Sequence, residues 1–355
     1  MYRWFFMAAL AFSLTACGAE PVVKTAKLWP ELDSLFQHDP RWIGGDGAYS
    51  CDLGDNRILW LFGDSSIAKD ATRNTDTGYF IRNSLAIQTG YDPKSAYMAF
   101  YWGDKDGHPS SFFQENGPRW FWPGACARVG KGLVIFGQFL LQTGVGQFGF
   151  GAEGSAAYFV ADADTDPLQW QAKEAQMPNP STDLILGTAG TVHGDFVYVY
   201  GAKGATHDYV IARFAIKDAE KADFSHGEFF ASGAWQNAAN FATTPAAIFT
   251  LGAPESSVHF DEKLQLYTMF QSEGFGATTL AIRTAAAPEG PWSAAQSFFR
   301  PPESFEEGAF VYAGKGHPEI RGGGMAVSYV PSRFESDLRP SPKDYYFPHF
   351  VSVTY

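Results

Sequence analysis

The feature that most restricts the fold of this chain is a pattern of short apolar segments that recurs five times. Each unit opens with a segment rich in small residues, continues after a turn with a strongly apolar segment, and then has a third apolar segment. Gly, Asp, Asn and Pro separate the segments, as is typical of β-strands joined by turns. The units start near residues 46, 124, 187, 255 and 317. A repeat of about 60 to 80 residues with several strands in it indicates the blades of a β-propeller.

We therefore predict an all-β, five-bladed propeller with four-stranded antiparallel blades. First strands are expected at 46–51, 124–129, 187–192, 255–260 and 317–320, and weaker fourth strands at 97–102, 168–171, 229–235 and 292–299. The fifth unit ends with the chain at Tyr355, so residues 27–36 are expected to supply its fourth strand and to close the ring. A β-sandwich with coincidentally even spacing is the alternative.

The composition agrees with this fold class and excludes others. The chain has 37 Gly and 21 Pro, and 16% of its residues are aromatic, which favours strands and turns over a helical bundle. With 45% hydrophobic residues it can offset the entropy of ordering, so it is not a disordered chain. Its net charge of −12 would repel phosphate, which argues against a nucleic-acid partner.

The N-terminus has the pattern of a secretory signal. Arg3 is followed by a short apolar run, which ends in Leu14-Thr15-Ala16-Cys17. This ending resembles the bacterial lipobox, which implies cleavage after residue 16 and a lipid on Cys17. We expect a signal peptide at 1–16, a lipidated tether at 17–30 and the propeller at 31–355. An ordinary signal peptide with an incidental cysteine is the alternative. Gly18, in place of an inner-membrane retention Asp, points to the outer membrane and thus to the cell envelope.

Two other cysteines, Cys51 and Cys126, remain after cleavage. They could pair in an oxidising compartment, but both lie in apolar strand patterns, so we expect buried free thiols. No Cys/His pattern supports a metal site, and we expect no cofactor. We further expect a monomer that contacts a glycan and, through the lipid on Cys17, a membrane.

Two aspartates are the candidate catalytic residues. Asp46 lies between glycines at the start of the first strand of unit one, and Asp64 follows the end of the next strand. Because neighbouring antiparallel strands run in opposite directions, the two carboxylates should meet at one mouth of the central channel. Paired carboxylates can hydrolyse a glycosidic bond, one as acid and the other as base or nucleophile. Each Asp could instead only cap a turn.

Further residues are predicted to bind substrate. Equivalent positions in other units place Gln138, Glu255, Gln271 and His317 at the same mouth. A third carboxylate there would raise the pKa of one of the aspartates. Trp122, just before a channel strand, could stack on a sugar ring, and Asn83 could supply polar contacts. The alternatives are a surface turn for Glu255 and core packing for His317 and Trp122.

Several of these segments together resemble a known family. They are 44–50, 60–65, 83–84, 122–124, 287–293 and 315–320. They are similar to a bacterial five-bladed propeller family, formerly of unknown function, that includes inverting endo-D-arabinanases. Residues 288–293 also look like the blades of other furanosidase propellers, such as arabinanases and fructosidases. The resemblance spans about residues 38–355, although Cys51-Asp52 departs from the usual apolar pattern.

The resemblance implies a catalytic pair at Asp46 and Asp64. The expected function is that of a lipid-anchored, arabinanase-like glycoside hydrolase, with an inverting mechanism, acting on a furanose-containing polysaccharide or glycan. A non-catalytic glycan-binding lipoprotein that uses the same mouth is the alternative. A propeller scaffold that binds a protein partner on its blade faces is a third interpretation.

Overall fold

The computed structural model describes residues 23–73, 78–145, 149–204, 206–274, 279–333 and 346–355. The predicted signal peptide and the predicted lipidation residue, Cys17, lie outside these residues. Within the described ranges, no helix is both long enough and apolar enough to cross a membrane.

The predicted all-β class is confirmed. Most strands belong to five antiparallel sheets, each of four or five strands. The first contains β3 (Tyr49–Gly54), β4 (Arg57–Phe62), β7 (Ser84–Thr89) and β8 (Tyr97–Tyr101). The second contains β11 (Arg119–Val129), β12 (Gly132–Gln142), β13 (Phe150–Val160) and β14 (Lys173–Ala175). The third contains β15 (Leu184–His193), β16 (Phe196–Lys203), β17 (Tyr209–Ala215), β18 (Glu228–Ala231) and β19 (Ala234–Asn237).

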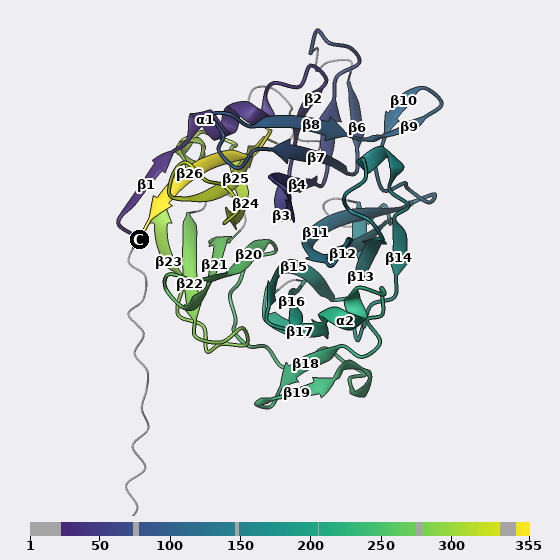
Figure 1. Ribbon diagram of the computed structural model, residues 1–355, viewed down its shortest axis with the longest axis vertical. Helices are drawn as coiled ribbons and strands as arrows, with labels where there is room; N and C mark the ends of the chain where they lie inside the picture. Colours follow the sequence, from purple (N-terminus) through teal and green to yellow (C-terminus); the bar gives the residue numbers. More distant parts are fainter. Residues whose placement is uncertain (1–22, 74–77, 146–148, 205, 275–278, 334–345) are drawn as a thin grey trace, which may run out of the picture.

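The last two sheets complete the set. The fourth contains β20 (Ser256–Asp261), β21 (Leu266–Ser272), β22 (Leu280–Ala285) and β23 (Gln296–Phe299). The fifth contains β24 (Phe310–His317), β25 (Met325–Ser332), β26 (His349–Thr354) and β1 (Thr25–Leu28). In Figure 1 the sheets follow one another around a common centre, and β3, β11, β15, β20 and β24 are the innermost strands.

Small elements connect these sheets. One further sheet contains β2 (Trp42–Gly45), β5 (Ser65–Ile67) and β6 (Tyr79–Ile81). Another contains β9 (Gly103–Lys105) and β10 (His108–Ser110). The helices are α1 (Pro30–Asp33) and α2 (Ile216–Ala219), and 3-10 turns lie at Ser34–Phe36, Pro167–Gln169, Ala238–Asn240 and Pro302–Phe305.

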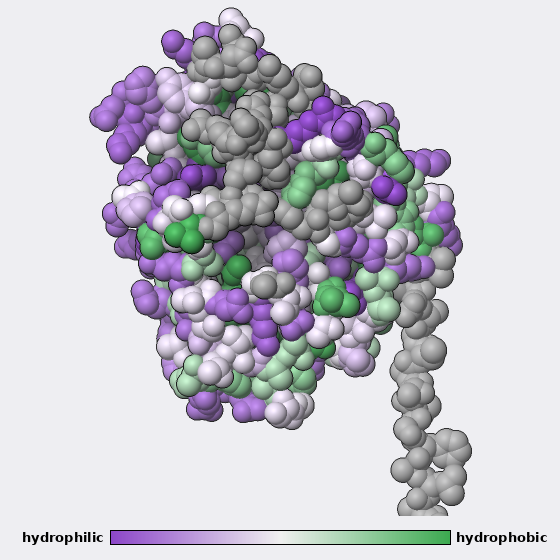
Figure 2. Space-filling model, turned by 180° about the vertical axis from the view of Figure 1, so that it is seen from behind, coloured by the Kyte–Doolittle hydropathy of each residue, from purple (hydrophilic) through white to green (hydrophobic). Residues whose placement is uncertain are grey.

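Each pair of neighbouring sheets buries a hydrophobic cluster, because a sheet covered on both sides needs apolar residues on both faces. Between the first and second sheets Leu59 lies in one cluster with Ile135, and between the second and third Phe136 lies with Val199. Between the third and fourth sheets Tyr200 lies with Met269, and between the fourth and fifth Phe270 lies with Tyr329. Between the fifth and first sheets Phe350 lies with Trp60. Many of the aromatic residues lie in these clusters. On the face shown in Figure 2, hydrophobic residues are scattered among hydrophilic ones.

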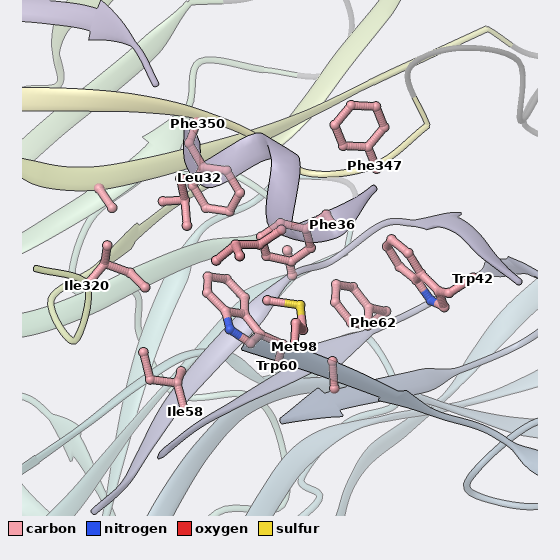
Figure 3. Packing of buried hydrophobic residues seen from close by; sticks show 14 of the residues in the cluster. Leu32, Phe36, Trp42, Ile58, Trp60, Phe62, Met98, Ile320, Phe347 and Phe350 are labelled. Carbon is pink, nitrogen blue, oxygen red and sulfur yellow. The ribbon is translucent and has the colours of Figure 1, made fainter. Parts of the chain in front are cut away.

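The N-terminal segment differs from the prediction. Residues 27–36 were expected to form one strand, but the strand that pairs with β26 is β1, with Thr25 opposite Thr354. Pro30 then starts α1, since proline suits the first turn of a helix. The turn that follows places Phe36 between Trp60 and Phe350, at centroid distances of 5.0 and 5.1 Å (Figure 3). The predicted tether, 17–30, therefore overlaps a strand.

Other boundaries also differ. The predicted fourth strand at 168–171 is a 3-10 turn, because Asp166 accepts a hydrogen bond from the Leu168 amide and caps it; β14 follows instead. Residues 229–235 form parts of two strands, β18 and β19, which are joined at Ser232 and Gly233, both with positive φ. The first strand of unit five starts at Phe310, seven residues before the predicted start at His317.

The expectation of free thiols at Cys51 and Cys126 is wrong. The two residues form a disulfide between β3 and β11, with Cα atoms 5.8 Å apart. Because these strands are neighbours from adjacent sheets, residues 75 positions apart in the sequence come within bonding distance.

Candidate active site

Asp46 and Asp64 lie next to each other, at the end of the five sheets where the innermost strand β3 begins. The Asp46 amide donates to the Asp64 carbonyl oxygen over 3.2 Å, and the Gly63 amide donates to the Asp46 carbonyl oxygen over 3.0 Å. Asp46 occupies the bend between β2 and β3, whereas Asp64 joins β4 to β5. The structure thus brings together the two aspartates that strand polarity placed at one mouth.

Asp46 has a partner that the sequence did not indicate. The Tyr312 hydroxyl, from β24, donates a hydrogen bond to Asp46 Oδ2 over 2.8 Å. Burial raises the pKa of Asp46 to about 8; the charges of Asp64 and Glu255 also raise it, and the hydroxyls of Tyr312 and Tyr346 lower it. Asp46 is therefore mostly protonated at neutral pH.

Asp64 has a more polar environment. The Trp122 indole N–H donates to Asp64 Oδ1 over 3.0 Å, and the Arg82 guanidinium donates to Asp64 Oδ2 over 3.3 Å. Burial raises the pKa of Asp64 only to about 6, because Arg82 and Trp122 stabilise the carboxylate. Asp64 is therefore mostly ionised at neutral pH. Arg82 also stacks on the Trp120 ring, 4.4 Å from its centroid, which holds the guanidinium in place.

Glu255 supplies a third carboxylate, at the start of β20. Lys315 donates to Glu255 Oε2 over 2.5 Å, and the Lys315 side chain is only 1% exposed. The Lys315 ammonium also lies 4.3 Å from the centroid of the Tyr49 ring. The Glu255 carboxylate is thus paired with a buried cation, and it is close enough to Asp46 for its charge to raise the pKa of Asp46.

Asp46, Asp64 and Glu255 line the main cavity, which has a volume of about 860 Å³. This volume is within the usual range for small-ligand sites. Its other polar lining residues include Glu115, Gln138, Gln142, Thr188 and His207, and its aromatic lining residues are Tyr49, Tyr79, Phe80, Trp122, Phe150 and Tyr312. Four of the five sheets contribute to the lining, and Pro254 and Glu255, just before β20 of the fourth sheet, complete it.

Of the predicted substrate-binding residues, Trp122, Gln138 and Glu255 line the main cavity. Trp122, however, uses its indole N–H to hold Asp64 and contacts the Phe150 ring edge-on, at 5.1 Å. Its role in the structure is therefore to fix the carboxylate as well as to form the wall.

Asn83 and Gln271 are buried away from the main cavity. Asn83 donates to the carbonyl oxygens of Phe113 and Phe121 and accepts from the Phe113 amide, so it ties a loop to β11. The Gln271 side chain accepts a hydrogen bond from Arg283 over 3.3 Å. Both amides satisfy internal groups, which sequence position alone could not reveal.

The placement of His317 at the same mouth is wrong. Because β24 starts at Phe310, His317 is its last residue and lies at the opposite end of the ring. There it lines a second cavity of about 330 Å³ and shares the Ser50 hydroxyl with Glu319. The residue that β24 presents to the main cavity is Tyr312. An earlier start of this strand, at the apolar run 310–313, would have identified it.

Within the described part of the chain, no group of three or more His, Cys, Asp or Glu side chains is arranged to hold a metal ion. The two aspartates of the main cavity differ in pKa, at about 8 for Asp46 and about 6 for Asp64.

A family model described as "Domain of unknown function (DUF5005)" matches residues 30–355. The chain belongs to this family. Its match includes both aspartates, Tyr312 and every residue of the main cavity. No curated protein is similar to this chain in sequence.

Comparison with solved structures shows the fold of this chain. A candidate hydrolase from Bacteroides ovatus superposes with a TM-score of 0.72 at 19% identity, covering 92% of this chain and 90% of its own. The xylan β-1,4-xylosidase from Bacillus halodurans gives a TM-score of 0.50 at 9% identity, covering 88% of this chain and 52% of its own. An exo-β-1,3-galactanase from Phanerochaete chrysosporium gives 0.49 at 12% identity, covering 87% and 59%. The chain has a propeller-like fold that is also found in a glycoside hydrolase.

Proposed function

We propose that this protein is a glycoside hydrolase that cleaves a neutral, furanose-containing polysaccharide or glycan, with Asp46 and Asp64 as its acid and base. The observation that carries the proposal is the unlike pair of adjacent carboxyl groups in the main cavity, one mostly protonated and the other mostly ionised at neutral pH. Unlike pKa values in a pair of carboxyl groups are how acid and base roles are assigned in such enzymes.

In this mechanism Asp46 donates its proton to the leaving glycosidic oxygen. Asp64, held as a carboxylate by Arg82 and Trp122, accepts a proton from a water molecule that attacks the anomeric carbon from the other side. The result is inversion at that carbon, as the resemblance to inverting endo-D-arabinanases implies. Glu255 supports the protonated state of Asp46 through its charge.

The charges of the main cavity favour a neutral substrate. Asp64, Glu115 and Glu255 bring negative charge, whereas Arg82 is already paired with Asp64. An anionic sugar would meet these carboxylates, and the one arginine among the described lining residues, Arg82, is already paired with Asp64. Tyr79, Phe80 and Phe150 provide aromatic surface for the apolar face of a sugar ring. The resemblance adds arabinan as the first substrate to test.

We also propose that the five sheets are the blades of one closed propeller, with β1 as the strand that joins its two ends. The five hydrophobic clusters between successive sheets, including the one between the fifth and the first, support this arrangement.

The cellular location is proposed from the N-terminal sequence and the disulfide. A lipid on Cys17 would anchor a monomer in the cell envelope, at the outer membrane, beside its glycan. The disulfide between Cys51 and Cys126 supports an oxidising compartment outside the cytosol.

The test is the release of reducing ends from D-arabinan, L-arabinan and fructan by protein that lacks residues 1–17. We expect cleavage of one of them, and a loss of activity of about 100-fold or more in Asp46→Asn and in Asp64→Asn. Asp166→Asn, at an exposed turn, is the matched control and should keep full activity. Saturable glycan binding without cleavage would favour the glycan-binding lipoprotein instead. Activity that survives both site substitutions would refute the assigned pair.

A further inference from the structure

Tyr312 acts on the proton of Asp46 as well as on its position, because its hydroxyl donates to one of the two carboxyl oxygens, Oδ2. The hydroxyl donates to Asp46 Oδ2 over 2.8 Å, from a side chain that is 7% exposed. Burial and the nearby charge of Asp46 raise the pKa of Tyr312 well above its usual value. The hydroxyl therefore keeps its proton and acts as the donor toward Asp46.

A protonated carboxyl group has two unlike oxygens. Its carbonyl oxygen accepts hydrogen bonds, whereas its hydroxyl oxygen carries the acidic proton and donates it. Since Oδ2 accepts from Tyr312, the stable arrangement places the carbonyl at Oδ2 and the proton at Oδ1.

Oδ1 lies close to Gly63, in a position that is possible only because residue 63 has no side chain. A Cβ atom at Gly63 would lie 2.5 Å from Asp46 Oδ1 and 3.8 Å from Trp122 Cδ1. Both Gly63 and Trp122 line the main cavity. The proton on Oδ1 is thus on the side of Asp46 that faces Gly63, toward the Trp122 wall of the cavity where Asp64 is held.

We propose that Tyr312 is a positioning residue that selects Oδ1 of Asp46 as the oxygen that carries the proton. The importance of this selection for catalysis rests on the proposed function, because a general acid must present its proton to the leaving oxygen. The selection itself depends only on the hydrogen bond and on the shape of the cavity.

The other groups near Asp46 change its pKa, and thus the fraction of molecules in which it is protonated. The charges of Asp64 and Glu255 raise the pKa of Asp46, and Glu255 forms an ion pair with Lys315. The Tyr346 hydroxyl lowers the pKa of Asp46, as the Tyr312 hydroxyl does. The Tyr346 hydroxyl donates to the main-chain oxygen of Asp64 over 3.0 Å. The Tyr312 hydroxyl is the one that lies at hydrogen-bonding distance from Oδ2, at 2.8 Å.

The test is infrared difference spectroscopy of the full chain, solubilised in detergent and titrated with acid and base. The carboxyl C=O band that Asp46→Asn removes belongs to Asp46. In Tyr312→Phe we expect this band at a higher frequency, because the carbonyl oxygen of Asp46 has lost a hydrogen-bond donor. The midpoint of the Asp46 titration should also rise by about one pH unit, because the Tyr312 hydrogen bond lowers the pKa of Asp46. Tyr49→Phe is the matched control: its hydroxyl, in the same cavity, donates to the Thr188 carbonyl oxygen, so neither the band nor the midpoint should move.

A second variant keeps the test valid if the phenylalanine variant does not fold. Site-specific 3-fluorotyrosine at position 312 has a more acidic hydroxyl and nearly the same volume, so the Asp46 band should move to lower frequency. An Asp46 band that moves in neither variant, or that moves equally in Tyr49→Phe, overturns the proposal.

The two proposals fail in different ways. If the spectra change as expected but no glycan is cleaved, Tyr312 positions the proton and the hydrolase proposal is wrong. If cleavage depends on Asp46 and Asp64 but the spectra do not respond to Tyr312, the hydrolase proposal stands and the positioning role is wrong. With a cleaved substrate, Tyr312→Phe should lower kcat about tenfold, leave KM within about twofold, and move the alkaline limb of the pH profile upward.

Discussion

The indole N–H of Trp122 donates a hydrogen bond to Asp64 Oδ1 over 3.0 Å. This contact turns a residue that the sequence suggested as a sugar platform into a support for the candidate base. Together with Arg82 it stabilises the ionised form of Asp64, so its removal should be visible in the pH dependence of activity.

Trp122→Phe should raise the pKa of Asp64, because it removes a hydrogen bond to the carboxylate. We expect the acidic limb of the activity profile to move to higher pH by up to about one unit and kcat at pH 6 to fall by about tenfold. Trp170→Phe is the control, since Trp170 donates to the Thr165 carbonyl oxygen in a distant turn. An unchanged acidic limb would show that Trp122 does not support Asp64.

Activity should follow a bell-shaped pH profile. Asp64 must be ionised, which requires a pH above about 6, and Asp46 must be protonated, which requires a pH below about 8. The maximum of kcat/KM is expected near pH 7, measured as the initial rate of reducing-end release. An activity that is constant from pH 5 to 9 would contradict these acid and base assignments.

Asp46→Asn should stabilise the fold in alkaline solution. The pKa of Asp46 is 3.8 in the unfolded chain and about 8 in the folded protein, so the folded protein binds this proton more tightly. The stability that this provides is complete below pH 3.8 and is lost as the pH rises through 8. Asparagine has no such loss, so at pH 9 the variant should be more stable by about 2 kcal/mol.

Thermal unfolding at pH 5 and pH 9 checks this expectation. The increase in Tm of Asp46→Asn over the unsubstituted protein should be clearly larger at pH 9, whereas Asp166→Asn should show no such difference. Equal shifts at both pH values would mean that Asp46 titrates as it does in the unfolded chain.

Loss of the disulfide should weaken the fold without affecting the main cavity, because Cys51 and Cys126 line the second cavity instead. Replacement of both by serine should lower the free energy of unfolding by about 2–4 kcal/mol. A reducing agent should lower the unfolding midpoint of the unsubstituted protein and leave that of the double variant unchanged. If the reducing agent shifts both proteins equally, the effect does not come from this bond.

Lys315→Met should be strongly destabilising, since it leaves Glu255 as a partly buried, unpaired charge. We expect a loss of about 3 kcal/mol in denaturant unfolding, and recovery of most of it in the double variant Lys315→Met with Glu255→Gln. In the double variant the alkaline limb of the activity profile should also move to lower pH, because the charge of Glu255, which raises the pKa of Asp46, is gone. Absence of recovery would show that Lys315 acts through packing alone.

The order of strands and the pair of aspartates could be predicted from the sequence because both depend on local patterns. Asp46 follows two glycines and Asp64 directly follows an apolar strand, and antiparallel polarity then brings them to one end. His317 was assigned to the wrong end because the position of a side chain along a strand depends on where the strand begins. Seven residues of error in that boundary moved it to the other side of the ring.

Other features depend on contacts between distant segments. The sequence around Cys51 and Cys126 is equally compatible with two buried thiols, and only the adjacency of β3 and β11 brings them into bonding distance. Asn83 has the same residue type as a ligand contact, but its amide is used by Phe113 and Phe121. Tyr312 meets Asp46 across 266 positions of sequence, a distance over which local patterns carry no information.

The pairing of β1 with β26 also has a consequence for biosynthesis. Residues 25–28 are made well before their hydrogen-bonding partners, 351–354, because Thr25 and Thr354 are 329 positions apart in the sequence. Until β26 has been made, β1 lacks its partner strand and the fifth sheet lacks two of its four strands. A chain that lacks residues 349–354 would therefore keep an open edge at β25, which could pair with a strand of another molecule.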